Sequence, residues 1–446
     1  MLSHHPTLRN SVFCILAVFA AMPAWAGWNS QVVLGTSAYQ GTIAIDSAGN
    51  LTAVWFQYQT PSGGAVNQIW ASTAAFGQPW SVPVNISGTI SVSGGNSQVR
   101  TSTGGKATAI YTDPTLGAAF VDHTAGGTWG TPGTTHGVNQ FYVSNGNGDD
   151  GLAWGVGATR QGAGVTSIAV VQRPAGGAWG SAATTIASGA HLNLDGALLS
   201  PNGTMAVVWE SFDAVCGSRT CKTSNWALHV SARAAGGSWV DSGVLLGPSA
   251  TQHFGQLAGD SAGDLGLATT SGGNLVSLVR HGTSWTGPVV IASSSAITFS
   301  SGVITQNRVF ASDSAGHATF VGFNGPNLLG LAAVDGNLTT NTWGTVQTIT
   351  GADQFPNYFD FALSSTGKAI AFYALVDQSS NTTWRAVTRS GPGLAWSAPA
   401  TAGTSFEGGG VPEGVALNAA GQAAVLFHGL SADFLTNIEY TNTFQP

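Results

Sequence analysis

The chain has 446 residues, of which 62 are glycine and only 7% are charged, and its formal net charge is −7. Its 13 lysine and arginine residues form no basic patch, which excludes a nucleic-acid partner. Few charges, frequent glycine and many β-branched residues predict a large number of short strands. The sequence therefore predicts an all-β protein.

The N-terminal segment has the pattern of a secretory signal peptide. Arg9 supplies a positive charge, residues 11–22 are apolar, and the sequence A-W-A ending at Ala26 matches a cleavage site. The apolar run is too short for a membrane span, and no second run of that kind follows. We expect cleavage after Ala26, a secreted or periplasmic location, and a mature chain of residues 27–446 that forms one domain without a membrane span.

Two short phrases recur along the mature chain. The first, D-S-A-G-N-L-T-A-V-W at residues 46–55, places an aspartate three residues before a glycine, as in a tight hairpin turn. The second, R-A-A-G-G-S-W at residues 233–239, is a glycine-rich turn followed by an aromatic anchor. Aligned on its glycine, the first phrase occurs eight times, at Gly49, Gly105, Gly148, Gly203, Gly263, Gly316, Gly367 and Gly421. Such a period predicts a repeat architecture.

The tryptophan of the second phrase indicates how the repeat closes. It follows seven of the eight copies, at Trp80, Trp129, Trp179, Trp239, Trp285, Trp343 and Trp396. The eighth copy lacks it, and an equivalent residue, Trp28, lies at the start of the mature chain. Each unit divides into four strand-like segments. The pattern predicts an eight-bladed β-propeller with four antiparallel strands per blade, closed by the N-terminal strand. An array of β-sandwiches is the alternative, but it does not explain the position of Trp28.

Large aromatic residues end the second strand of most units. We expect their side chains to be buried between neighbouring sheets, and a platform for sugar stacking is the alternative. These residues are Trp55, Tyr111, Trp154, Trp209, Tyr373 and Phe427.

Polar residues precede the innermost strand of each unit, where propeller loops surround the channel. Amides both donate and accept hydrogen bonds, so a ring of them suits a polyhydroxyl ligand. The alternative is that each side chain caps its own backbone. The predicted ligand-binding ring consists of Gln40, Asn96, Asn139, Asn193, His253, Asn307, Arg308, Asn357 and Glu413.

A polar segment at residues 211–225 is predicted to be a long loop, and Glu210 at its base is added to the ligand-binding set. Cys216 and Cys221 are the only cysteines of the mature chain, which predicts a local disulfide bond. No further ligands with zinc spacing lie nearby, so no metal or other cofactor is expected. The sequence N-G-N-G-D-D-G at residues 145–151 is interpreted as a polar turn rather than a calcium loop.

The repeated turn and aromatic phrases resemble those of secreted bacterial β-propellers of the broad sialidase-like kind. The sialidase Asp-box reads S-x-D-x-G-x-T-W, and the corresponding phrase here is D-S-A-G-N-L-T-A-V-W. The resemblance extends over residues 27–446 and implies the propeller fold and export. The arginine triad and tyrosine nucleophile of the sialidase family have no matching motif in this sequence.

The sequence therefore predicts an exported, monomeric, non-catalytic recognition module that binds a glycan at the polar mouth of the propeller channel. One alternative is a glycoside hydrolase or polysaccharide lyase on the same face, with Glu210, Glu413 or His253 as catalytic groups. A second alternative is an envelope or surface propeller with a protein ligand.

Overall fold

The computed structural model describes most of residues 27–446. The residues outside the description are 1–26, 60–65, 89–91, 93–96, 103–104, 114–116, 125, 136–139, 148–152, 162–163, 175–176, 181, 217–220, 299–308, 326–327, 329, 352–355, 377–380, 406–411 and 431–436. Within the described part every element is a strand and every strand pairing is antiparallel, which confirms the predicted all-β fold. None of the described segments is a helix that could cross a membrane.

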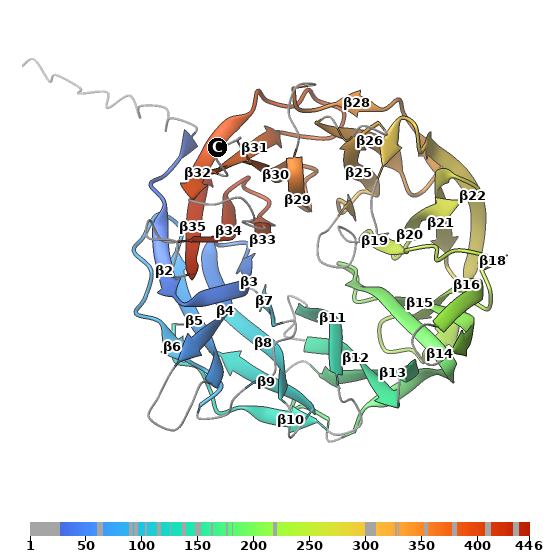
Figure 1. Ribbon diagram of the computed structural model, residues 1–446, viewed down its shortest axis with the longest axis horizontal. Coiled ribbons are helices and arrows are strands. Elements are labelled where there is room, and N and C mark those ends of the chain that lie inside the picture. Colours follow the sequence, from blue (N-terminus) through green and yellow to red (C-terminus); the bar gives the residue numbers. More distant parts are fainter. Residues whose placement is uncertain are drawn as a thin grey trace, which may run out of the picture.

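The sheets follow one another along the chain and radiate from a common axis, as in a β-propeller (Figure 1). The first two sheets contain β3 (Ala38–Ile45), β4 (Asn50–Gln59), β5 (Val66–Ala75) and β6 (Val84–Asn85), then β7 (Gln98–Ser102), β8 (Lys106–Asp113), β9 (Gly117–His123) and β10 (Gly133–Thr135). An eight-stranded sheet follows, with β11 (Gln140–Asn147), β12 (Ala153–Gln161), β13 (Gly164–Arg173), β14 (Thr184–Leu199), β15 (Met205–Cys216), β16 (Cys221–Arg233), β17 (Val240–Asp241) and β18 (Leu246–Ser249).

Four further sheets complete the chain. The first two contain β19 (Gln256–Gly259), β20 (Leu265–Ser271), β21 (Asn274–His281) and β22 (Ser284–Ser293), then β23 (Ile297–Thr298), β24 (Phe310–Ser312), β25 (His317–Asn324), β26 (Leu331–Asn337), β27 (Thr342–Trp343) and β28 (Gln347–Thr348). The last two contain β29 (Pro356–Leu363), β30 (Ala369–Val376), β31 (Thr382–Arg389) and β32 (Ala400–Ser405), then β33 (Pro412–Leu417), β34 (Ala423–Leu430) and β35 (Asn437–Gln445) with β1 (Gly27–Trp28) and β2 (Val32–Thr36).

Strand β14 divides the eight-stranded sheet into two groups. Its first part pairs with β13 up to Leu192, and its last part pairs with β15 from Leu192 onward. The same strand is therefore the outer strand of the β11–β14 group and the inner strand of the β14–β18 group. The innermost strands contact their neighbours in the order β3, β7, β11, β14, β19, β24, β29 and β33, and β33 contacts β3.

The N-terminal strands pair with the last strand of the chain. Trp28 of β1 is the cross-strand partner of Phe444, and their rings are 5.4 Å apart. Val32 of β2 is opposite Thr441. Figure 1 shows β2 beside β35, so the two ends of the described chain share one sheet.

The repeated D-x-x-G phrase forms the predicted hairpin turn. The Asp46 carboxylate accepts hydrogen bonds from the backbone N–H groups of Ala48 (2.9 Å) and Asn50 (2.7 Å), and Gly49 has φ 88°. The carboxylates of Asp260 and Asp313 bind their own turns in the same way. These aspartates are therefore structural, because their oxygens are used to hold the turn.

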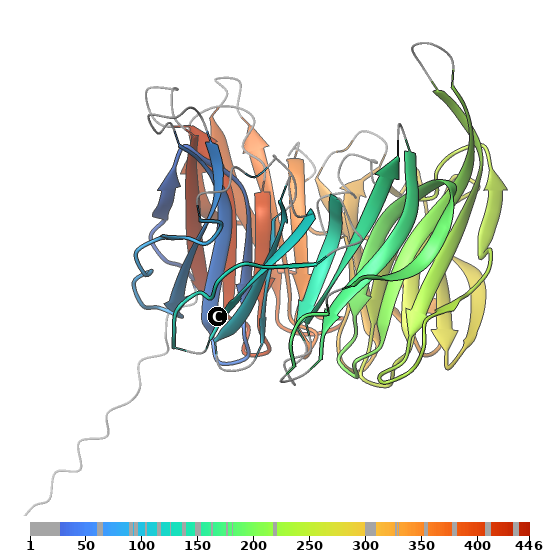
Figure 2. The same ribbon diagram turned by 90° about the horizontal axis from the view of Figure 1, so that it is seen from below.

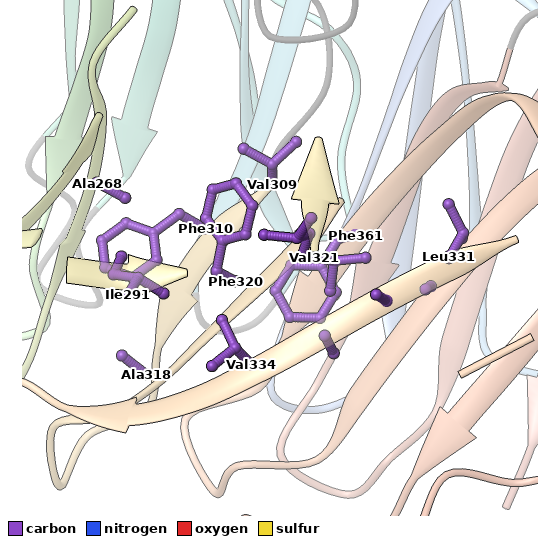
Figure 3. Packing of buried hydrophobic residues seen from close by; sticks show 14 of the residues in the cluster. Ala268, Ile291, Val309, Phe310, Ala318, Phe320, Val321, Leu331, Val334 and Phe361 are labelled. Atoms are coloured by element: carbon purple, nitrogen blue, oxygen red, sulfur yellow. The ribbon is translucent and has the colours of Figure 1, made fainter. Parts of the chain in front are cut away.

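The hydrophobic core lies between neighbouring sheets rather than in one central mass. Figure 3 shows part of the largest cluster, in which Phe310, Phe320 and Phe361 pack together from three different strands. The six aromatic residues predicted to be buried are at most 7% exposed, which confirms that prediction; they are Trp55, Tyr111, Trp154, Trp209, Tyr373 and Phe427.

Residues 211–225 are not a loop as predicted, because their described part continues β15 and β16 as a long hairpin. Figure 2 shows this hairpin rising beyond one face of the disc. The extension is stabilised by stacking of Phe212 on Trp226, with ring centroids 4.1 Å apart. Cys216 and Cys221 are cross-strand partners at its tip. Their side chains lie outside the description, so the disulfide bond stays a prediction.

Arginines at the end of several third strands contact the preceding group. Arg173 forms an ion pair with Asp122, and Arg389 forms one with Asp335. Asp122 is the cross-strand partner of Thr108, and the same register places Ala232 opposite Ala206. In the repeat, Ala232 corresponds to Asp122, and Arg280 corresponds to Arg173, so an alanine stands where an acceptor for Arg280 would lie. Burial lowers the pKa of Arg280. This arginine row links neighbouring groups at the end of the sheets that carries the D-x-x-G turns.

Candidate functional site

The structure places five residues of the predicted ligand-binding set at two junctions between sheets. Asn193, Glu210 and His253 lie together where the β14–β18 group meets the β19–β22 sheet. Gln40 and Glu413 lie together where the last sheet meets the β3–β6 sheet. Asn96, Asn139, Asn307 and Arg308 are outside the described residues, and Asn357 belongs to β29 without a described side chain.

Each junction is built around a carboxylate on a β-bulge of an inner strand. The register of β14 shifts between Leu194 and Gly196, which leaves Asp195 as the extra residue. The register of β33 shifts in the same way around Glu413. A bulge re-aims its side chain, and here both carboxylates reach the backbone of the next inner strand. Asp195 accepts a hydrogen bond from the backbone N–H of Gly255 (3.1 Å), and Glu413 accepts one from Gly41.

The first junction carries a set of five polar residues, which we name the β14–β19 cluster: Asn193, Asp195, Glu210, Gln252 and His253. Asp195 Oδ1 accepts hydrogen bonds from Asn193 Nδ2 (2.5 Å) and Gln252 Nε2 (3.3 Å). Glu210 Oε1 accepts one from the backbone N–H of His253 (2.6 Å). Both carboxyl groups are therefore held by donors from the segment that precedes β19, and Asp195 is also held by Asn193 of its own strand.

Backbone conformation supports this arrangement. Phe254 has φ 57°, a left-handed conformation that is uncommon for a residue with a side chain. It separates His253 from Gly255, whose backbone N–H groups bind Glu210 and Asp195 respectively. The kink at this position thus directs the donors on either side of Phe254 to two different carboxyl groups. Gln40, with φ 52°, is the corresponding kink at the second junction.

The two carboxyl groups of the β14–β19 cluster have displaced pKa values. Burial raises the pKa of Asp195 to about 7, although hydrogen bonds from Gly255, Gln252 and Asn193 act in the opposite direction. Burial and the charge of Asp195 raise the pKa of Glu210 to about 9. At neutral pH the pair therefore holds at least one proton and can both donate and accept a hydrogen bond.

The members of the cluster differ in their access to solvent. Glu210 and His253 are buried, at 0% and 5% exposure. Asn193, Asp195 and Gln252 are partly exposed. A ligand can therefore contact the two amides and Asp195 directly, whereas Glu210 and His253 support them from behind.

The second junction contains the β33–β3 cluster, which we define as Gln40, Gly41, Glu413, His428 and Glu439. Glu413 Oε1 accepts the backbone N–H of Gln40 (2.6 Å) and lies 2.6 Å from His428 Nδ1. Burial would raise the pKa of Glu413, but the contacts with His428 lower it below its usual range. Burial alone would lower the pKa of His428, but the hydrogen bond and charge of Glu413 raise it above the usual value. Glu439 is buried beside them, and burial and the Glu413 charge raise its pKa well above the usual value.

The two clusters occupy equivalent places in the repeat. Asp195 and Glu413 both lie eight residues before the aligned glycine, and Glu210 and His428 both lie seven residues after it. Asp195, Gln252, His428 and Glu439 are not in the predicted ligand-binding set. Asp195 shares its position in the repeat with Glu413, and His428 shares its position with Glu210. These shared positions were the signal that could have identified Asp195 and His428. Within the described residues no three His, Cys, Asp or Glu side chains are placed to hold a metal ion.

No protein-family model matches the chain, and no curated protein matches it. Similar solved structures include the β-propeller domain of the Trilobed protease from Pyrococcus furiosus, at 7% identity and a TM-score of 0.46, covering 82% of this chain and 98% of that one. The NanB sialidase from Streptococcus pneumoniae has 12% identity and a TM-score of 0.36, with coverages of 95% and 71%. Aleuria aurantia lectin in complex with α-methyl-L-fucoside has 12% identity and a TM-score of 0.39, with coverages of 82% and 95%. These likenesses are to propeller-type proteins and assign no activity to this chain.

Proposed function

We propose that the mature chain is an eight-bladed β-propeller closed by its N-terminal strands. The division of β14 into two parts supports eight groups of strands rather than seven sheets. The cycle of contacts between inner strands, including β33 with β3, supports a ring. The pairing of Trp28 with Phe444 supports closure between the first and last strands. We also propose that residues 1–26 direct export and are removed, which the mass of the secreted protein tests.

We propose that this propeller is a recognition module that binds a glycan through the β14–β19 cluster. The observation that carries the proposal is the fixed geometry of Asn193, Asp195 and Gln252, which are partly exposed yet joined by hydrogen bonds. Sugar hydroxyls act as both donors and acceptors, and amides and carboxylates are the side chains that complement them. Because these groups are already held in place, binding requires little further loss of side-chain entropy.

A second candidate function is acid–base catalysis on a glycan at the same place. The carboxyl pair of Asp195 and Glu210 favours it, because a carboxyl group that stays protonated at neutral pH is suited to act as a general acid. Burial of Glu210 argues for the recognition module, since a general acid must reach the bond that it protonates. Asp195 is the better placed of the two for such a role.

A glycan array probed with the purified mature protein tests the proposal, followed by a reducing-end assay on the polysaccharides that bind. Binding without product release supports the recognition module. Binding with product release that Asp195→Asn abolishes would replace it with the catalytic function. Failure to bind any glycan would overturn both sugar functions and leave a protein ligand as the explanation of an exported propeller.

A further inference from the structure

An arginine that has no partner among the described residues lies between the β14–β18 group and the β19–β22 sheet. Arg280 of β21 is the cross-strand partner of Leu265 and of Trp285, which both pack in the hydrophobic cluster that joins the two groups. Because cross-strand partners share a face, the Arg280 side chain points toward the β14–β18 group (Figure 1). Ala206 and Ala232 belong to the same cluster and lie on the facing side of the junction.

The equivalent arginine has an acceptor at three other junctions. In each of them an arginine of a third strand donates to a side-chain oxygen on the third strand of the preceding group; the pairs are Arg173–Asp122, Arg233–Gln172 and Arg389–Asp335. The register shows that the positions correspond. Arg280 and Arg389 both lie opposite the residue two places after the aligned glycine, and Ala232 and Asp335 both lie opposite the residue three places after it.

Two polar side chains that hold the arginine elsewhere are alanine at this junction. Thr319 Oγ1 donates to Asp335 (2.7 Å), and both of these residues accept hydrogen bonds from Arg389. Ala206 and Ala232 are cross-strand partners at the corresponding positions. The junction therefore keeps the cation of the set and lacks the carboxylate and the hydroxyl that would neutralise and orient it.

The neighbouring side chains leave the guanidinium accessible to a small ion. Leu265 is larger than Ala369, its equivalent opposite Arg389, but it leans toward the inner strand β19, because a Cβ atom at Gly259 would lie 3.2 Å from Leu265 Cδ2. Arg280 is 7% exposed, and its nitrogen atoms are not completely buried, in contrast to Nε of Arg389. A largely buried cation without a counter-charge is unfavourable, so binding of an anion here would stabilise the fold.

We propose that Arg280 forms a binding site for a small monocarboxylate, such as formate or acetate, whose carboxylate takes the place of the Asp335 side chain at the equivalent junction. A guanidinium and a carboxylate form two parallel, charge-assisted hydrogen bonds. The single charge of the arginine matches that of the ligand. The methyl groups of Ala206 and Ala232 suit the hydrogen or methyl group that the ligand carries. The low exposure of Arg280 favours such an ion over a large acid.

This site is separate from the β14–β19 cluster, although both lie at the same junction. Ala206 and Glu210 are four residues apart on β15, which is about 13 Å at about 3.3 Å per residue. Val208 is buried between them. The inference does not depend on the function proposed for the β14–β19 cluster.

Saturation-transfer NMR on the mature protein tests the site with acetate as the probe and acetamide as an uncharged probe of the same shape. The Ala232→Asp variant places a carboxylate on the protein itself and should exclude acetate. Arg280→Met removes the charge that binds it. Ala75→Asp is the matched control, because it adds the same charge at an exposed alanine of β5.

We expect saturable binding of acetate, competition by formate, and no saturable binding of acetamide. Ala232→Asp and Arg280→Met should each weaken acetate binding by about tenfold or more, while Ala75→Asp leaves it unchanged. An Asn193→Ala variant should also leave it unchanged, which separates this site from the β14–β19 cluster. Absence of saturable acetate binding, equal binding of acetamide, undiminished binding by Ala232→Asp, or loss of binding in Asn193→Ala would each overturn the inference.

Discussion

Replacing Glu210 by glutamine should remove much of the pH dependence of stability. The pKa of Glu210 is about 9 in the folded protein, against a usual value of 4.5. Between these two pH values the folded state holds a proton that the unfolded state has released, so the free energy of unfolding falls as the pH rises. Each unit of displacement corresponds to about 1.4 kcal/mol, which gives on the order of 6 kcal/mol over the whole window.

Glutamine keeps the shape of the side chain and its acceptor oxygen for the backbone N–H of His253, but it cannot ionise. The Glu210→Gln variant should therefore match the native protein near pH 5 and exceed it by several kcal/mol near pH 9. Urea denaturation followed by tryptophan fluorescence at pH 5, 7 and 9 measures the difference. Asp213→Asn is the control, because it removes a charge from an exposed position on the same strand, β15. A variant that loses stability with pH as steeply as the native protein would refute the reasoning.

Three further predictions concern the frame of the protein. Deleting residues 27–36 removes β1 and β2 and should lower the melting temperature of the whole domain; an unchanged melting curve would show that the ring closes without them. Ala232→Asp supplies the missing acceptor to Arg280 and should raise the melting temperature, whereas a fall would mean that the arginine row does not repeat there. Mass spectrometry of the purified protein without residues 1–26, treated with a thiol-alkylating reagent, should find no free thiol if Cys216 and Cys221 form the predicted disulfide bond; two alkylated thiols would contradict this.

The sequence predicted the frame of the protein well, because each repeat carries local signals. The D-x-x-G turn depends on contacts within five residues, as at Asp46, so one copy is enough to recognise it. The eighth repeat lacks its tryptophan, and Trp28 at the start of the described chain is the equivalent residue. This displacement indicated that the N-terminal strand pairs with the last sheet. Residues 211–225 were mistaken for a loop because the stacking of Phe212 on Trp226 joins two strands and leaves no periodic pattern.

The candidate sites were predicted only in part, because their contacts join different repeats. Glu413 and Gln40 are 373 residues apart, and nothing local to either indicates that one binds the backbone of the other. Glu439 was not predicted to belong to a site, because the burial and the Glu413 charge that raise its pKa depend on packing between strands.

The most direct test of the proposed function is the affinity of the strongest glycan ligand for the mature protein and for an Asn193→Ala, Gln252→Ala double variant. Both amides are partly exposed donors to Asp195, so their loss should weaken binding by about tenfold or more without unfolding the protein. A double variant of two exposed amides away from the cluster, Gln78→Ala with Gln347→Ala, is the control and should bind like the native protein. Equal affinity of all three proteins would contradict glycan recognition by the β14–β19 cluster.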